Sequence, residues 1–72
     1  MQQSQQTSVS NTYYNLVSVL YHALEEAQTA SAYIQDAQQS GNQQLVQVFQ
    51  SVQQTANQQA QQAQQLLAQS SR

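Results

Sequence analysis

The chain contains one glycine, Gly41, and no proline, so its backbone has one preferred place to reverse direction. On both sides of this glycine, apolar residues recur at steps of three and four, the spacing that places side chains on one face of a helix. The N-terminal pattern runs from Tyr13 to Ala37, and the C-terminal pattern runs from Leu45 to Leu67. The sequence therefore predicts two long helices that meet at Gly41.

Residues with capping side chains stand at the expected helix ends. Ser10 or Asn11 is suited to cap the first helix, and Asn42 is suited to cap the second. Gly41 fits the left-handed position that follows a helix C-terminus. These signals predict the following division of the chain: a disordered tail at 1–10, a helix at about 11–39, a turn at 40–42, a helix at about 43–69 and a second tail at 70–72.

A connection this short forces the two helices to run antiparallel, which predicts an all-α fold, an αα-hairpin. Two helices side by side leave their apolar stripes half exposed, so we expect two hairpins to pair into a homodimeric four-helix bundle. In the second helix, the coiled-coil spacing predicts a seam in which Gln59 is the one polar residue: Leu45, Phe49, Val52, Ala56, Gln59, Ala63 and Leu66. The residues predicted to form the core and the dimer interface are Leu16, Val17, Leu20, Leu24, Ile34, Leu45, Phe49, Val52, Leu66 and Leu67.

Charged residues are scarce, whereas 21 of the 72 residues are glutamine. The only basic residue is Arg72, so the chain lacks the positive charge needed to bind nucleic acid or an anionic membrane. It has neither an apolar run of about 20 residues nor the features of a secretory signal, which predicts a soluble, cytoplasmic protein. It also has no cysteine to form a disulfide or a thiolate metal site.

The high glutamine content raises two further questions: whether the chain is disordered, and why its surface lacks charges. A prion-like, disordered chain is one alternative, but glutamine and alanine both favour helix and the apolar period persists through the glutamine-rich segment. Since bundle surfaces normally mix Glu, Lys and Arg, either the source favours glutamine or surface charges were replaced deliberately. The periodicity favours helix for residues 11–69.

The segment "LYHALEEA" contains the main candidate for a metal site: His22, Glu25 and Glu26. These side chains are neighbours on a helix at i, i+3 and i+4, and imidazole with carboxylates suits iron, manganese or zinc. On a helical wheel centred near Leu20 and Ala27, however, His22 lies roughly 150° from the apolar centre, which favours a solvated polar face. Since Asp36 is roughly 16 Å along the helix axis from Glu25, we do not expect it to join the site.

The sequence gives little support for catalysis or for a chemical role of the tyrosines. The chain has one histidine and no evident nucleophile–base pair, so we expect no enzymatic activity. Tyr13 belongs to the apolar stripe of the first helix and supplies apolar area. Tyr14, Tyr21 and Tyr33 lie outside its centre, which leaves open an adaptor that receives a partner helix.

The segments "YNLVSVLYHAL", "YIQDAQQSGN" and "LVQVFQSVQQ" resemble small bacterial two-helix proteins of the ferritin-like superfamily, over about residues 12–68. The resemblance implies a dimeric four-helix bundle, and it implies that Glu25 or Glu26 stands where a first-helix glutamate ligand would be. The second helix has no acid or histidine, and glutamines occupy the stretch where the remaining ligands would be sought: Gln53, Gln54 and Gln58.

Taken from sequence, the leading hypothesis is a non-catalytic, self-associating helical bundle with a structural or protein-interaction role and no cofactor. The alternative is a ferritin-like protein that binds iron, manganese or zinc through His22 and Glu25 or Glu26 at a subunit contact.

Overall fold

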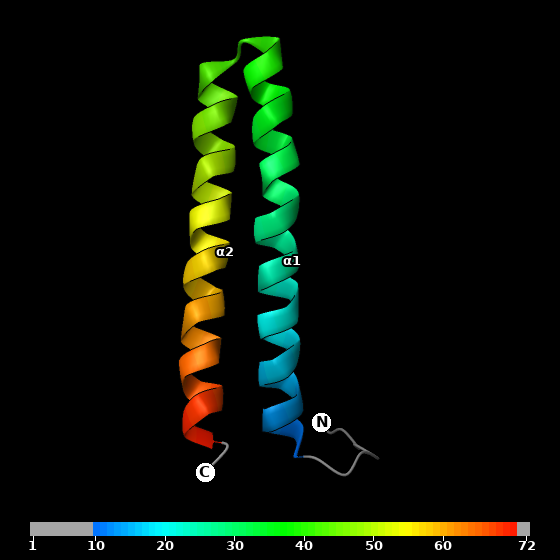
Figure 1. Cartoon of the computed structure of the whole chain (residues 1–72), viewed down its shortest axis with the longest axis vertical. Coiled ribbons are helices and arrows are strands. Elements are labelled where there is room, and N and C mark those ends of the chain that lie inside the picture. The colour runs from blue at the N-terminus through cyan, green and yellow to red at the C-terminus, as the bar shows by residue number, and fades with distance from the viewer. Residues whose placement is uncertain (1–9, 71–72) are drawn as a thin grey trace.

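The computed structural model describes residues 10–70 and consists of two helices, α1 (Asn11–Ser40) and α2 (Gln43–Ser70). They run antiparallel side by side, and the first turn of α1 lies at the same end as the last turn of α2 (Figure 1). The all-α, two-helix architecture expected from sequence is confirmed. Each helix extends one residue beyond its predicted C-terminal end. The predicted tails lie outside the described residues, except that Ser10 caps α1 and Ser70 belongs to α2.

The turn and the caps follow from three residues. Ser10 is the N-cap of α1, and its Oγ accepts a hydrogen bond from the Tyr13 backbone N–H at 3.2 Å. Gly41 has φ 73°, a left-handed conformation that costs glycine little because it has no Cβ. Asn42 then caps α2, with its Oδ1 accepting from the Leu45 N–H at 3.1 Å. The chain thus reverses over two residues.

Alanine dominates the interface between α1 and α2. Ala30 has no exposed surface, and none of the large side chains in the described part of the chain is fully buried. Small side chains at this seam let the two helices approach closely. The buried residues are Ala23, Ala27, Ala30 and Ala37 of α1 and Val46, Ala56, Ala60 and Ala63 of α2.

The seam of α2 differs from the predicted one by a small rotation. Phe49, Ala56 and Ala63 belong to both, but Gln59 is exposed and Ala60 is buried in its place. The polar residue at the observed seam is Gln53, which is half-buried. Its Nε2 donates to the Ala27 carbonyl at 2.9 Å and to Ser31 Oγ at 2.8 Å.

The ten predicted core residues flank this alanine seam without being buried in a single chain. Half-buried members are Leu16, Leu20, Ile34, Phe49, Val52 and Leu67. Exposed members are Val17, Leu24, Leu45 and Leu66. The hairpin alone therefore has a thin core, with its larger apolar side chains arranged along the edges of the seam.

The hairpin is a flat, elongated body, with principal extents of 49 × 25 × 16 Å. Its radius of gyration is 16.1 Å, whereas a compact chain of this length would have one of about 11 Å. Within residues 10–70, neither helix combines the length and the hydropathy that crossing a membrane requires.

Candidate functional site

His22 projects from the exposed surface of α1, where two neighbours contact it. Its Nδ1 lies 3.4 Å from Ser18 Oγ, one helical turn earlier. The Tyr21 ring meets the imidazole edge-on, with centroids 5.3 Å apart and planes at 75°. The sequence-based interpretation missed this serine–histidine pair, although the i, i+4 spacing of Ser18 and His22 could have indicated it.

The two glutamates have different surroundings. Glu25 is exposed, and its backbone carbonyl accepts a hydrogen bond from Thr29 Oγ1 at 2.9 Å. Glu26 lies at the edge of α1 that borders α2, where it lines an open groove. All three metal-ligand candidates are exposed, but Glu26 differs from His22 and Glu25 in that it borders α2.

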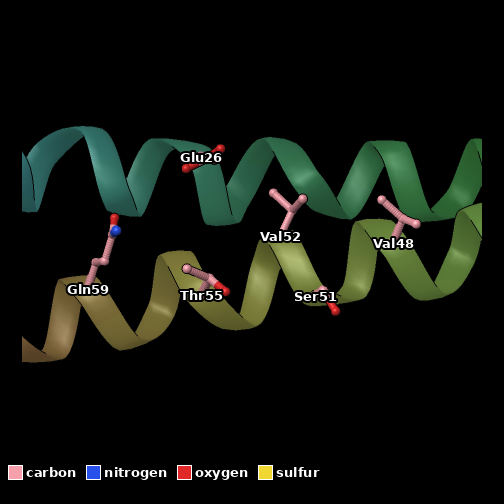
Figure 2. Close-up of a pocket in the computed structure, with 6 residues that line it drawn as sticks. All are labelled: Glu26, Val48, Ser51, Val52, Thr55 and Gln59. Carbon is pink, nitrogen blue, oxygen red and sulfur yellow. The ribbon is translucent and has the colours of Figure 1, made fainter.

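The groove beside Glu26 runs along one face of the hairpin and has a volume of about 430 Å³. Figure 2 shows its walls: Val52 and Gln59 extend from α2 toward α1, and Glu26 lies on α1. The residues lining it are Glu26, Val48, Ser51, Val52, Thr55 and Gln59. Of these, Glu26 is the only charged residue.

A second groove, of about 390 Å³, continues along the same face toward the ends of the hairpin opposite the turn. Gln59 belongs to both grooves and joins them. The other lining residues are mostly apolar: Leu16, Val19, Gln62, Ala63 and Leu66. The two grooves together form a strip with apolar ends and a polar centre.

Within the described residues, no three side chains of histidine, cysteine, aspartate or glutamate come together as a group able to hold a metal ion. His22, Glu25 and Glu26 belong to one helix and α2 adds no acid or histidine, so a single hairpin offers too few ligands to enclose a cation. Asp36 is exposed near the end of α1, away from the other acids. Any metal site at His22 would have to draw ligands from a second chain.

The four tyrosines are all partly exposed and do not form a cluster. Tyr33 packs against Phe49 across the interface near the turn, with ring centroids 5.5 Å apart and planes at 55°. Tyr21 is 62% exposed, and Tyr14 is 50% exposed. Tyr33 thus contributes to helix packing, while Tyr14 and Tyr21 face solvent.

Comparison of the chain with protein-family models, with curated proteins and with solved structures found no match.

Proposed function

We propose that this protein is a non-catalytic, self-associating helical bundle, in which two hairpins pair to form four helices. The observation that carries the proposal is the distribution of apolar residues. Alanine fills the interface within the hairpin, while larger apolar side chains such as Val19, Val48 and Leu66 remain about half exposed. Burying such side chains is the main favourable term in association, at about 25 cal/mol per Å².

The shape of the hairpin supports the same proposal. Its broad sides extend over 49 × 25 Å, and a standard protein–protein interface buries roughly 800 Å² on each partner. A second hairpin laid on one broad side would cover an area of this size.

The chemistry around His22 supports the non-catalytic part of the proposal. Ser18 and His22 form a pair, but no carboxylate in residues 10–70 hydrogen-bonds the imidazole to orient it. A serine–histidine pair acts as a nucleophile efficiently only when a third group fixes the base and donors stabilise the oxyanion. We therefore expect no measurable hydrolytic activity above that of a Ser18→Ala variant.

Native mass spectrometry combined with sedimentation analysis tests this proposal. We expect a dimer mass, with no stoichiometric adduct after addition of Fe(II), Mn(II) or Zn(II). A monomer at concentrations up to about 1 mM would overturn it, because a Kd above that value corresponds to less than about 4 kcal/mol of association energy. A metal bound in stoichiometric amount and lost in a His22→Ala variant would favour the metal-binding alternative at a subunit contact.

A further inference from the structure

The hairpin has two broad faces, and they differ in the side chains that α2 contributes to each. The groove face is the one that carries both grooves, with Glu26 and Val19 on α1 and with Val48, Thr55 and Leu66 on α2. The opposite face carries Val17, Leu24 and Ser31 of α1. Leu24 and Glu26 point to different faces because two residues correspond to about 200° of helical rotation.

On the groove face, exposed apolar side chains come from both helices, whereas on the opposite face the large ones come from α1. On the groove face, Val19 of α1 is matched by Val48 and Leu66 of α2, and all three are about half exposed. On the opposite face, Gln53 of α2 contacts Ser31 of α1. The exposed α2 residues on that face include three amides spaced one heptad apart: Gln50, Asn57 and Gln64. The groove face is therefore the one with apolar side chains from both helices.

We infer that the groove face is the surface on which a second copy of this chain docks, and that the charge of Glu26 limits the strength of that contact. This inference rests on the proposed self-association and names its interface. A second copy is the fitting occupant because the groove face is lined mostly by apolar and neutral side chains with one charged residue, so its complement is another nearly uncharged apolar face, which this chain itself provides. The broad sides of the hairpin extend over 49 × 25 Å, which leaves room for the roughly 800 Å² that each partner buries in a standard interface.

Glu26 lies near the midpoint of α1, and this position determines its surroundings in such a dimer. If two groove faces meet with full overlap, the two Glu26 residues lie at the same level, whether the copies run parallel or antiparallel. Each carboxylate then loses water, and in the antiparallel arrangement, which lays α1 on α1, it also approaches the carboxylate of the other copy. Both effects oppose association, since like charges across an interface are costly.

The groups around Glu26 do not neutralise it. The described part of α2 contributes no acid, base or histidine, and its groove residues near Glu26 are hydroxyl and amide side chains: Ser51, Thr55 and Gln59. On α1, His22 lies one turn before Glu26, and Glu25 points elsewhere. Hydroxyl and amide groups can hydrogen-bond a neutral glutamine as well as a carboxylate, so Gln at position 26 keeps the partners and removes the repulsion.

The dimer dissociation constant, measured by sedimentation equilibrium at neutral pH, tests this inference. Glu26→Gln should tighten the dimer by about tenfold or more. Glu25→Gln, which removes the same charge from the exposed neighbour, is the matched control and should change the constant by less than about twofold. A dimer whose dissociation constant is the same in wild type and Glu26→Gln would overturn the inference, while leaving the proposed self-association intact.

A second measurement locates the face without relying on charge. The chain has no cysteine, so single Thr55→Cys and Leu24→Cys variants each place one thiol on one face. The rate of alkylation by iodoacetamide should fall several-fold with rising protein concentration for Thr55→Cys and stay constant for Leu24→Cys. The reverse pattern would place the contact on the opposite face and overturn the inference. A monomer in every variant would instead contradict the self-association itself.

Discussion

Gln53 is a polar residue in a seam that is otherwise apolar, and its amide links the two helices directly. Its Nε2 donates both to a backbone carbonyl of α1 and to Ser31 Oγ. A polar group at a seam position favours the one alignment in which its partners are reached. Gln53 thus fixes the lengthwise alignment of α2 on α1, a role that small, similar alanines cannot supply.

Substituting Gln53 by alanine should lower the free energy of unfolding by about 1–2 kcal/mol, since two hydrogen bonds are lost and one of their acceptors, the Ala27 carbonyl, belongs to a buried residue. Urea denaturation monitored by circular dichroism measures the change. Gln54→Ala is the matched control, because Gln54 is exposed, and it should change stability by less than about 0.5 kcal/mol. Equal effects of the two substitutions would show that the Gln53 contacts add no stability.

Gly41 permits a second prediction at this scale. A Cβ added there would meet no atom within 4 Å, so the cost of substitution comes from the backbone conformation alone. With φ at 73°, Gly41→Ala should lose about 1 kcal/mol of stability, whereas Gly41→Asn should lose less, because asparagine tolerates the left-handed region. Thermal melting of both variants measures the difference. A Gly41→Ala variant as stable as Gly41→Asn would contradict this account of the turn.

At the scale of the elements, the sequence predicts the helices better than the way they face one another. One glycine, two caps and the apolar period are local signals, and local signals suffice to locate α1, the turn and α2. The apolar stripe of α2 is wide, with adjacent apolar pairs such as Leu45–Val46 and Leu66–Leu67. Periodicity alone does not show which residue of such a pair is buried. The close approach of the helices determines the buried residue, since small residues pack nearest to the line of contact.

The same reason explains which parts of the candidate site could be predicted. The i, i+3 and i+4 spacing shows that His22, Glu25 and Glu26 are neighbours on one helix. Whether Glu26 borders α2 depends on the rotation of α1, which its alanines determine through packing and not through hydrophobicity. A wheel centred on the alanines Ala23 and Ala30, in place of Leu20 and Ala27, would have placed Glu26 at the edge of the interface.

The alanine seam leads to a prediction for α1. Ala30 is fully buried against α2, so Ala30→Leu should force the helices apart and cost about 1–3 kcal/mol. For a domain of this size, that cost corresponds to a fall in melting temperature of about 4 °C or more. Ala32→Leu adds the same side chain at an exposed position of the same helix, and we expect its melting temperature to stay within about 2 °C of wild type. A similar melting temperature for both variants would mean that the seam is loosely packed.

At the scale of the whole molecule, the flat shape and the thin core predict that stability depends on the proposed association. A hairpin whose buried residues are seven alanines and one valine gains little apolar burial by itself. In proteins, most of the stability of a helix comes from tertiary packing of its apolar face. The proposed second copy would supply that packing.

This dependence predicts a melting temperature that rises with protein concentration. For a dimer that dissociates on unfolding, a rise of about hundredfold in concentration adds about 2.7 kcal/mol of stability per mole of dimer. For a small domain, this raises the melting temperature by several degrees.

Val48→Glu is the control, because it adds a second negative charge to the groove beside Glu26 at a position that is 54% exposed in the hairpin. We expect that variant to melt at a lower temperature, with no dependence on concentration. A wild-type melting temperature that stays constant over the same range would show that one hairpin is stable alone, despite its alanine core.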